Sequence, residues 1–103
     1  MHARITKADI QPGKMNDVIK AYQESVLPAT RQQEGFKHAL LLVDRDASIG
    51  LSITIWEDEE KLALSEVSTY YIEQLRKLAQ YFAGLPVRDS YEVVVFEGDE
   101  KAS

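Results

Sequence analysis

The sequence contains no cysteine, and this absence excludes several kinds of chemistry. Disulfides, thiolate metal ligands, iron–sulfur clusters and cysteine nucleophiles all need that side chain. Histidine is also scarce, because only His2 and His38 are present. They lie too far apart in the sequence to form a local metal-binding motif. The residues therefore predict no metal site.

Positive charge and long apolar runs are scarce as well. The 103 residues include 12 Lys and Arg against 17 Asp and Glu, which gives a net charge of −5. Such a chain repels nucleic-acid phosphates, and its basic residues are scattered rather than grouped. No apolar run approaches the length of a membrane span, and the first residues lack the apolar stretch of a signal peptide. We therefore expect a cytoplasmic protein that binds neither nucleic acid nor membranes.

What is present is the composition of a folded protein, with 45% hydrophobic and 28% charged residues. A chain of this length is expected to form one domain, which we place at residues 1–98, followed by a short polar tail at residues 99–103. The most informative segment is 50–66, because its hydrophobic pattern changes period from two to about 3.6. This change predicts a strand that runs directly into a helix.

The first half of the chain contains one strand pattern, one helix pattern and a second strand pattern. A strand is predicted at residues 3–10, and apolar residues at spacings of three and four predict a helix from Met15. Pro28 removes a backbone hydrogen bond from this helix and should kink or restart it. Gly35 is expected to supply the left-handed position that caps the helix, before a strand at residues 36–44.

The second half of the chain completes the pattern. A short polar turn joins the strand at residues 36–44 to the strand at residues 51–56, which predicts an antiparallel hairpin. A helical region follows from residue 58, with a break near Ser68, and a last strand is predicted at residues 91–96. This β-α-β-β-α-β order belongs to the α+β class. It predicts the ferredoxin-like fold, a four-stranded antiparallel sheet with both helices on one face.

The predicted second and last strands carry apolar residues at consecutive positions, so both faces of the sheet are expected to be apolar. Helices can cover only one of these faces. The other would expose more apolar surface than monomers usually do. A second copy that packs sheet to sheet around a twofold axis is the natural cover. We therefore predict a homodimer in which the two sheets form a shared barrel.

Several short segments follow one another in an order that is found in a known family. They are Pro12-Gly13-Lys14, Leu27-Pro28-Ala29, Glu34-Gly35-Phe36 leading into residues 37–42, and residues 53–57 followed by Asp58-Glu59-Glu60. In this order they resemble the antibiotic biosynthesis monooxygenase-like family of dimeric α+β barrels. The resemblance implies this fold, a dimer, and a pocket between sheet and helices in each subunit.

Some members of that family oxidise aromatic polyols or quinols with molecular oxygen and without a metal or flavin. The resemblance therefore implies a monooxygenase without a cofactor, acting on a small aromatic, phenolic or quinol-type substrate. The family also contains members without known activity, and a fold does not fix a function. The alternative is a noncatalytic dimeric module that binds a small molecule or serves as an accessory subunit.

The resemblance also suggests where a substrate would bind. Trp56 ends a strand where a pocket wall is expected, and its ring would stack on an aromatic substrate. Ser52 takes the place of a hydrogen-bonding amide in the polyketide oxygenases of the family and keeps a hydroxyl group. Tyr70 and Tyr71 are predicted to line the same cavity. For the aromatic residues, the alternative is ordinary packing in the core.

Two residues are candidates for catalysis. Arg76 lies at a distance from Trp56 that resembles the position of a pocket arginine in those oxygenases, and it would hold a phenolate or peroxy anion. His38 lies in an apolar setting on the second predicted strand and is suited to accept a proton near neutral pH. The alternatives are that Arg76 faces solvent and that His38 belongs to the core or to an interface.

Overall fold

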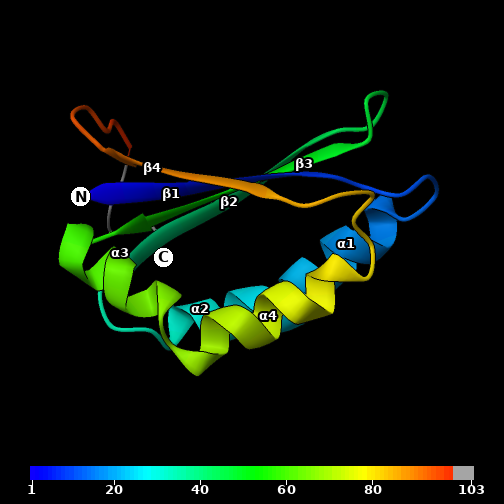
Figure 1. Cartoon of the computed structure of the whole chain (residues 1–103). Helices are drawn as coiled ribbons and strands as arrows, with labels where there is room; N and C mark the ends of the chain where they lie inside the picture. Colours follow the sequence, from blue (N-terminus) through cyan, green and yellow to red (C-terminus); the bar gives the residue numbers. More distant parts are fainter. Residues whose placement is uncertain (99–103) are drawn as a thin grey trace.

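The computed structural model describes residues 1–98, so the predicted tail at residues 99–103 lies outside the described residues. The elements follow the predicted order, and each helical region is divided into segments (Figure 1). The strands are β1 (His2–Asp9), β2 (Phe36–Asp44), β3 (Ile49–Trp56) and β4 (Val87–Glu92). The first helical region consists of α1 (Met15–Ala21), the π-helical turn η1 (Tyr22–Val26) and α2 (Leu27–Arg31), and the second of α3 (Glu59–Glu66) and α4 (Thr69–Ala79).

The four strands form an antiparallel sheet in the order β2–β3–β1–β4. This arrangement confirms the predicted ferredoxin-like fold. The helices lie against one face of the sheet, and no described helix crosses the other (Figure 1). We call these the covered face and the open face. Within residues 1–98, no helix has both the length and the apolar character that a membrane crossing requires.

The first helical region widens just before its proline. The N–H of Leu27 donates to the carbonyl of Tyr22, five residues earlier, instead of four. Pro28 has no N–H to donate, and the short segment α2 contains it, as the predicted restart required. Gly35 has the expected positive φ, at 86°. It lies in the turn before β2 rather than in the helix cap, because the helix already ends at Arg31.

The predicted break in the second helical region is confirmed. Asp58 caps α3, because its Oδ1 accepts a hydrogen bond from the N–H of Lys61 at 2.8 Å. Ser68 precedes α4, but its hydroxyl donates to the carbonyl of Ser65 at 2.7 Å instead of capping α4. At the break, Val67 faces solvent and is 79% exposed, although it is apolar.

The prediction for the last strand was wrong in its position. It placed the strand at residues 91–96, whereas β4 spans Val87–Glu92. The cause is a long-range pairing, since Glu92 lies opposite His2, where β1 begins. The N–H of Val93 still donates to the carbonyl of Met1 at 3.0 Å, but within residues 1–98 the strand pairing ends there. Val94 and Val95 are exposed, and Phe96 stacks on the ring of His38 with the ring centroids 4.8 Å apart.

Candidate functional site

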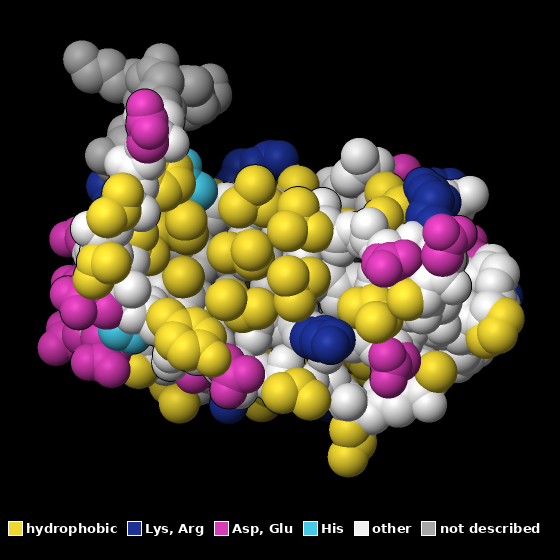
Figure 2. Space-filling model, turned by 90° about the horizontal axis from the view of Figure 1, so that it is seen from above, with side chains coloured by type: hydrophobic (Ala, Val, Ile, Leu, Met, Phe, Trp, Pro, Cys, Tyr) yellow, Lys and Arg dark blue, Asp and Glu magenta, His cyan; other side chains and the backbone are white. Residues whose placement is uncertain are grey.

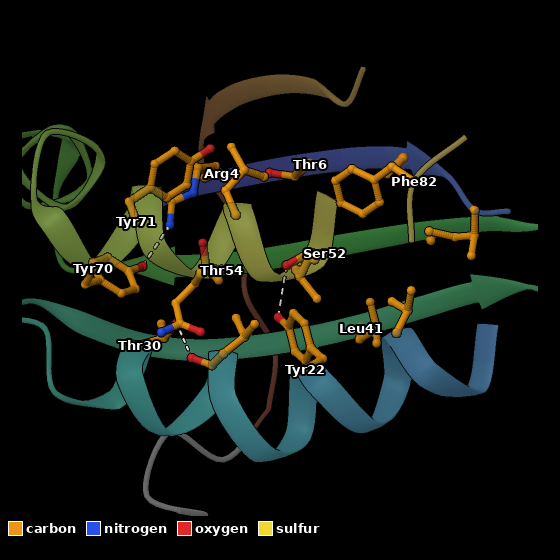
Figure 3. A pocket seen from close by; sticks show the side chains of 18 residues that line it. Arg4, Thr6, Tyr22, Thr30, Leu41, Ser52, Thr54, Tyr70, Tyr71 and Phe82 are labelled. Atoms are coloured by element: carbon orange, nitrogen blue, oxygen red, sulfur yellow. Dashed lines mark hydrogen bonds between the residues drawn. The ribbon is translucent and has the colours of Figure 1, made fainter. Parts of the chain in front are cut away.

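A cavity of about 80 Å³ lies between the covered face and the helices and is partly open to solvent (Figure 3). One water molecule needs roughly 10–15 Å³, so the space holds several waters or one small organic molecule. Ala8 and Gly50 lie opposite each other near the end of β1 and the start of β3, and both line the cavity. Their small size leaves space between the layers at this end.

The cavity is polar at one end and apolar at the other. Across β1 and β3, Arg4 lies opposite Thr54 at the polar end, and Thr6 lies opposite Ser52 one step further along. The apolar end is lined by side chains from the end of β1, the first helical region and the second helical region: Ile10, Val18, Leu75, Leu78 and Phe82. A ligand with an apolar ring and one polar group would match this division.

Arg4 dominates the polar end. Its side chain is 4% exposed, and its Nη1 donates to Ser65 Oγ at 2.9 Å and to Glu66 Oε2 at 3.4 Å. Its Nη2 donates to the hydroxyl of Tyr70 at 3.2 Å. The guanidinium carbon lies 4.7 Å from the centre of the Tyr71 ring, a distance typical of a cation–π contact. These contacts hold a positive charge at the wall of the cavity.

The carboxylate of Glu66 is shared by two arginines. Besides Arg4, the Nε of Arg88 lies 3.7 Å from the same Glu66 oxygen. Arg88 also donates from Nη1 to the hydroxyl of Tyr71 at 3.0 Å. Within residues 1–98, no group of three or more His, Asp or Glu side chains is arranged to hold a metal ion. Arg4, Arg88 and Glu66 therefore form an arginine–glutamate cluster at the polar end.

Two hydroxyl groups meet in the middle of the cavity. The Tyr22 hydroxyl and Ser52 Oγ are 2.9 Å apart, and either can be the donor. Burial raises the pKa of Tyr22 above its ordinary value of 10.0, and the hydrogen bond from Ser52 opposes this only in part. The phenol of Tyr22 thus keeps its proton near neutral pH. This pair can donate a hydrogen bond to a ligand oxygen or accept one.

Three of the four predicted substrate-binding residues line the cavity, and the fourth does not. Ser52, Tyr70 and Tyr71 are all lining residues (Figure 3). Trp56 is fully buried behind them and lines no part of it. Its Nε1 donates to Thr54 Oγ1 at 3.0 Å, so the ring is fixed in the core, as the alternative interpretation expected.

The two predicted catalytic residues lie outside the cavity. Arg76 is exposed, because α4 turns Gln74, Leu75 and Leu78 toward the sheet and leaves Arg76 facing solvent. His38 lies on the open face, since a bulge after Phe36 shifts the register of β2 and sets His38 opposite Ile55. The Nε2 atom of His38 is buried without a hydrogen-bond partner among the described residues. Neither Arg76 nor His38 therefore lines the cavity.

Sequence reasoning missed Arg4 and Tyr22. The signal for Arg4 was its alternation along β1 with Ala3 and Ile5, which places it on the same face as Thr6. A polar set of this kind usually indicates the solvent side of a strand. Only the position of the helices shows that it lies on the covered face.

A family model described as antibiotic biosynthesis monooxygenase matches residues 1–74. No curated protein matches. One similar solved structure is SnoaB, a cofactor-independent oxygenase from Streptomyces nogalater, with a TM-score of 0.77 and 11% identity; the match covers 95% of this chain and 97% of that chain. A second is an antibiotic biosynthesis monooxygenase with a TM-score of 0.73 and 20% identity, covering 92% of this chain and 100% of that chain. A third is Rv0793 from Mycobacterium tuberculosis, with a TM-score of 0.74 and 11% identity, covering 94% of this chain and 98% of that chain. At these identities the three structures show a shared fold.

Proposed function

Because the chain belongs to the antibiotic biosynthesis monooxygenase family, we propose that it oxidises a small phenolic or quinol-type substrate with molecular oxygen and without a cofactor. The observation that carries this proposal is the cavity, which is partly open, apolar at one end and supplied with hydroxyl groups and a guanidinium toward the other. SnoaB, which has the same fold, is described as a cofactor-independent oxygenase. The fold and the cavity are thus compatible with this chemistry.

The reaction needs positioning more than it needs reactive side chains. A deprotonated phenol can itself pass an electron to oxygen, so the protein must hold the ring, exclude most water and allow one proton to leave. In the overall step, a ring carbon gains one oxygen atom and the phenol becomes a quinone. The hydrogen of that carbon and the hydrogen of the hydroxyl leave with the second oxygen atom as water.

We assign the substrate-binding roles to residues that line the cavity. Ser52 and Tyr22 offer hydrogen bonds in its middle, and Tyr70 and Tyr71 form the aromatic wall of its polar end. The aliphatic side chains at the apolar end would hold the ring. Because the cavity is partly open, solvent water can take up the proton that the substrate releases.

Oxygen uptake tests this function. The protein is incubated with a panel of hydroquinones and single-ring phenols in an oxygen-electrode cell. Ser52→Ala and Tyr70→Phe should each lower the rate by roughly 3- to 10-fold, since a neutral hydrogen bond contributes about 1 kcal/mol. Glu73→Gln, at an exposed position of α4, serves as the control and should not change the rate.

Two outcomes would contradict the proposal: no uptake with any member of the panel, or uptake that both cavity variants leave unchanged. Arg76→Ala belongs in the same assay. A large loss of rate in that variant would restore the role that the sequence suggested for this arginine.

The size of the cavity favours a second candidate, a noncatalytic small-molecule-binding module. At about 80 Å³ it is smaller than the roughly 150 Å³ of an engineered cavity that takes up benzene, so a fused polycyclic compound would not fit without movement of the lining. A single ring that projects partly through the opening is the largest fit. Binding of such a compound without oxygen uptake would favour this candidate.

We also propose that the protein is a homodimer through the open face. Figure 2 views this face, on which apolar side chains gather over the strands. Leu40 and Leu42 of β2, at one edge of the sheet, are 46% and 48% exposed, and Val87 and Tyr91 of β4, at the opposite edge, are also exposed. A patch of this kind, with few charges at its centre, is the composition of a subunit interface.

A further inference from the structure

We propose that Arg4 is an anion anchor, so that the cavity selects single-ring aromatic ligands that carry one negatively charged oxygen group. This inference rests on the proposed use of the cavity as a binding site and adds the charge of the ligand. The shared chemistry is that of an aromatic carboxylate or a phenolate. Two features of Arg4 carry it: its local charge balance and its unused hydrogen-bond donors.

The charge balance around Arg4 leaves one positive charge in excess. Arg4 and Arg88 both approach the single carboxylate of Glu66, at 3.4 Å and 3.7 Å. A strong charge-assisted pair is shorter, about 2.7–2.9 Å, so Glu66 compensates neither arginine fully. Arg88 reaches solvent, with 46% of its side chain exposed, and water screens its charge. The cluster as a whole therefore carries one positive charge in excess, and Arg4 is the member that lines the cavity.

The donors of Arg4 are only partly used by the protein. A guanidinium has five N–H groups, and the hydrogen bonds to Ser65, Glu66 and Tyr70 use three of them. Within residues 1–98, the other N–H on Nη2 and the N–H on Nε have no hydrogen-bond partner. These donors are on neighbouring nitrogens of one guanidinium, a group that can bind two oxygens of a carboxylate or one phenolate oxygen.

The surroundings of Arg4 fix it in place for this purpose. Tyr71 and Trp56 pack against its guanidinium, with ring centres 4.7 Å and 5.4 Å from the guanidinium carbon. Tyr70 holds the Nη2 end at 3.2 Å (Figure 3). An anchor that is already ordered loses little entropy when a ligand binds. The ring of the ligand would then extend along the cavity toward Ser52 and the apolar end.

Ligand binding under nitrogen tests the anchor separately from oxidation. Benzoate is compared with benzamide, and pentafluorophenol, which is ionised at neutral pH, with pentafluorobenzene, by isothermal titration calorimetry. Each anion should bind roughly 10- to 100-fold more tightly than its neutral partner, the range expected for hydrogen bonds to a charged group. Whichever anion binds more tightly identifies the carboxylate or the phenolate as the preferred group.

Variants then assign the preference to one residue. Arg4→Met should abolish the preference for the anion, whereas Arg4→Lys, which keeps the charge, should retain part of it. Arg88→Met is the comparison variant, because it leaves Glu66 to Arg4 alone: it should lower the preference, but by less than Arg4→Met, since the donors of Arg4 remain. If Arg4→Met fails to fold, the wild-type comparison and Arg4→Lys still decide.

Several results would overturn the anchor: equal affinity for the charged and neutral partners, no binding of either anion, or the same loss in Arg88→Met as in Arg4→Met. These results are distinct from a failure of the oxygenase function. Anions that bind through Arg4 without any oxygen uptake would leave the anchor standing and support the noncatalytic module. Oxidation of neutral quinols by a protein without anion preference would overturn the anchor alone.

Discussion

The two faces of the sheet reverse the usual distribution of polar and apolar residues. The covered face buries Arg4 and Thr54 beneath the helices, whereas the open face presents leucines to solvent. Buried polar groups cost free energy unless they are hydrogen-bonded, and exposed apolar groups cost free energy unless they are covered. Arg4 and Thr54 have hydrogen-bond partners within the chain, whereas the leucines of the open face are the surface that we propose a second copy covers.

The largest expected effect is on the proposed dimer interface of the open face. Leu42→Asp would place a charge in the centre of the proposed interface, and twofold symmetry would introduce it twice. We expect the dissociation constant of the dimer to rise by at least roughly 100-fold, from the lost apolar burial and the cost of burying a charge. Sedimentation equilibrium at micromolar concentration measures this change.

Leu64→Asp is the control for this experiment, because Leu64 is similarly exposed, at 54% against 48% for Leu42, but lies on α3 in the helix layer. It should leave the dimer intact. A wild-type protein that sediments as a monomer, or a Leu42→Asp variant that remains a dimer, would remove the proposed interface.

A smaller effect tests whether the polar groups of the covered face are structurally required. Thr54→Val removes the acceptor of the Trp56 Nε1–H hydrogen bond and leaves a buried donor without a partner. We expect the free energy of unfolding to fall by about 1–3 kcal/mol. Urea unfolding monitored by the fluorescence of the single tryptophan measures this loss.

Thr6→Val provides the matched substitution on the same face. The Thr6 hydroxyl lines the cavity but makes no side-chain hydrogen bond within residues 1–98, so the change should stay within about 0.5 kcal/mol. Equal losses in the two variants would mean that the Trp56 hydrogen bond does not explain the cost.

The smallest expected effect is a pH dependence that arises on the covered face. Burial raises the pKa of Tyr22 above 10.0, the value expected in the unfolded chain. Below pH 10.0 both states keep the proton, so Tyr22 makes no contribution to the pH dependence there. Above it the unfolded state loses the proton first, and the free energy of unfolding falls with rising pH by at most about 1.4 kcal/mol per pH unit.

Urea unfolding at a series of alkaline pH values tests this assignment. Tyr22→Phe should flatten the decline in stability. Tyr81→Phe, which changes a tyrosine that neither lines the cavity nor lies on the open face, should not. Flattening of equal size in both variants would show that the decline does not come from Tyr22.

The fold was predictable where its signals are local. The hairpin of β2 and β3, the proline restart and the break before α4 all follow from period changes and turn residues within a few positions. The position of β4 was not, because four of its six residues are polar and the segment acquires its place only by pairing with β1. The more conspicuous valine run beyond Glu92 drew the prediction away from it.

The candidate site was only partly predictable for a related reason. Alternation along a strand separates its residues into two sets but does not say which set meets the helices. Ser52 was therefore identified through the resemblance, while Arg4 on the neighbouring strand was not. His38 shows a second limit, since the bulge after Phe36 shifts the register by which a face would have been assigned.

The shape of the cavity depends on the number of residues in the π-helical turn η1. A π turn accommodates one residue more than an α-helical turn, so deleting one residue there would rotate the following helix by about 100° relative to α1. Val18 precedes the turn and Thr30 follows it, yet both line the cavity. Removing even the exposed Gln23 would thus move one of these walls away from the other, whereas replacing it would not.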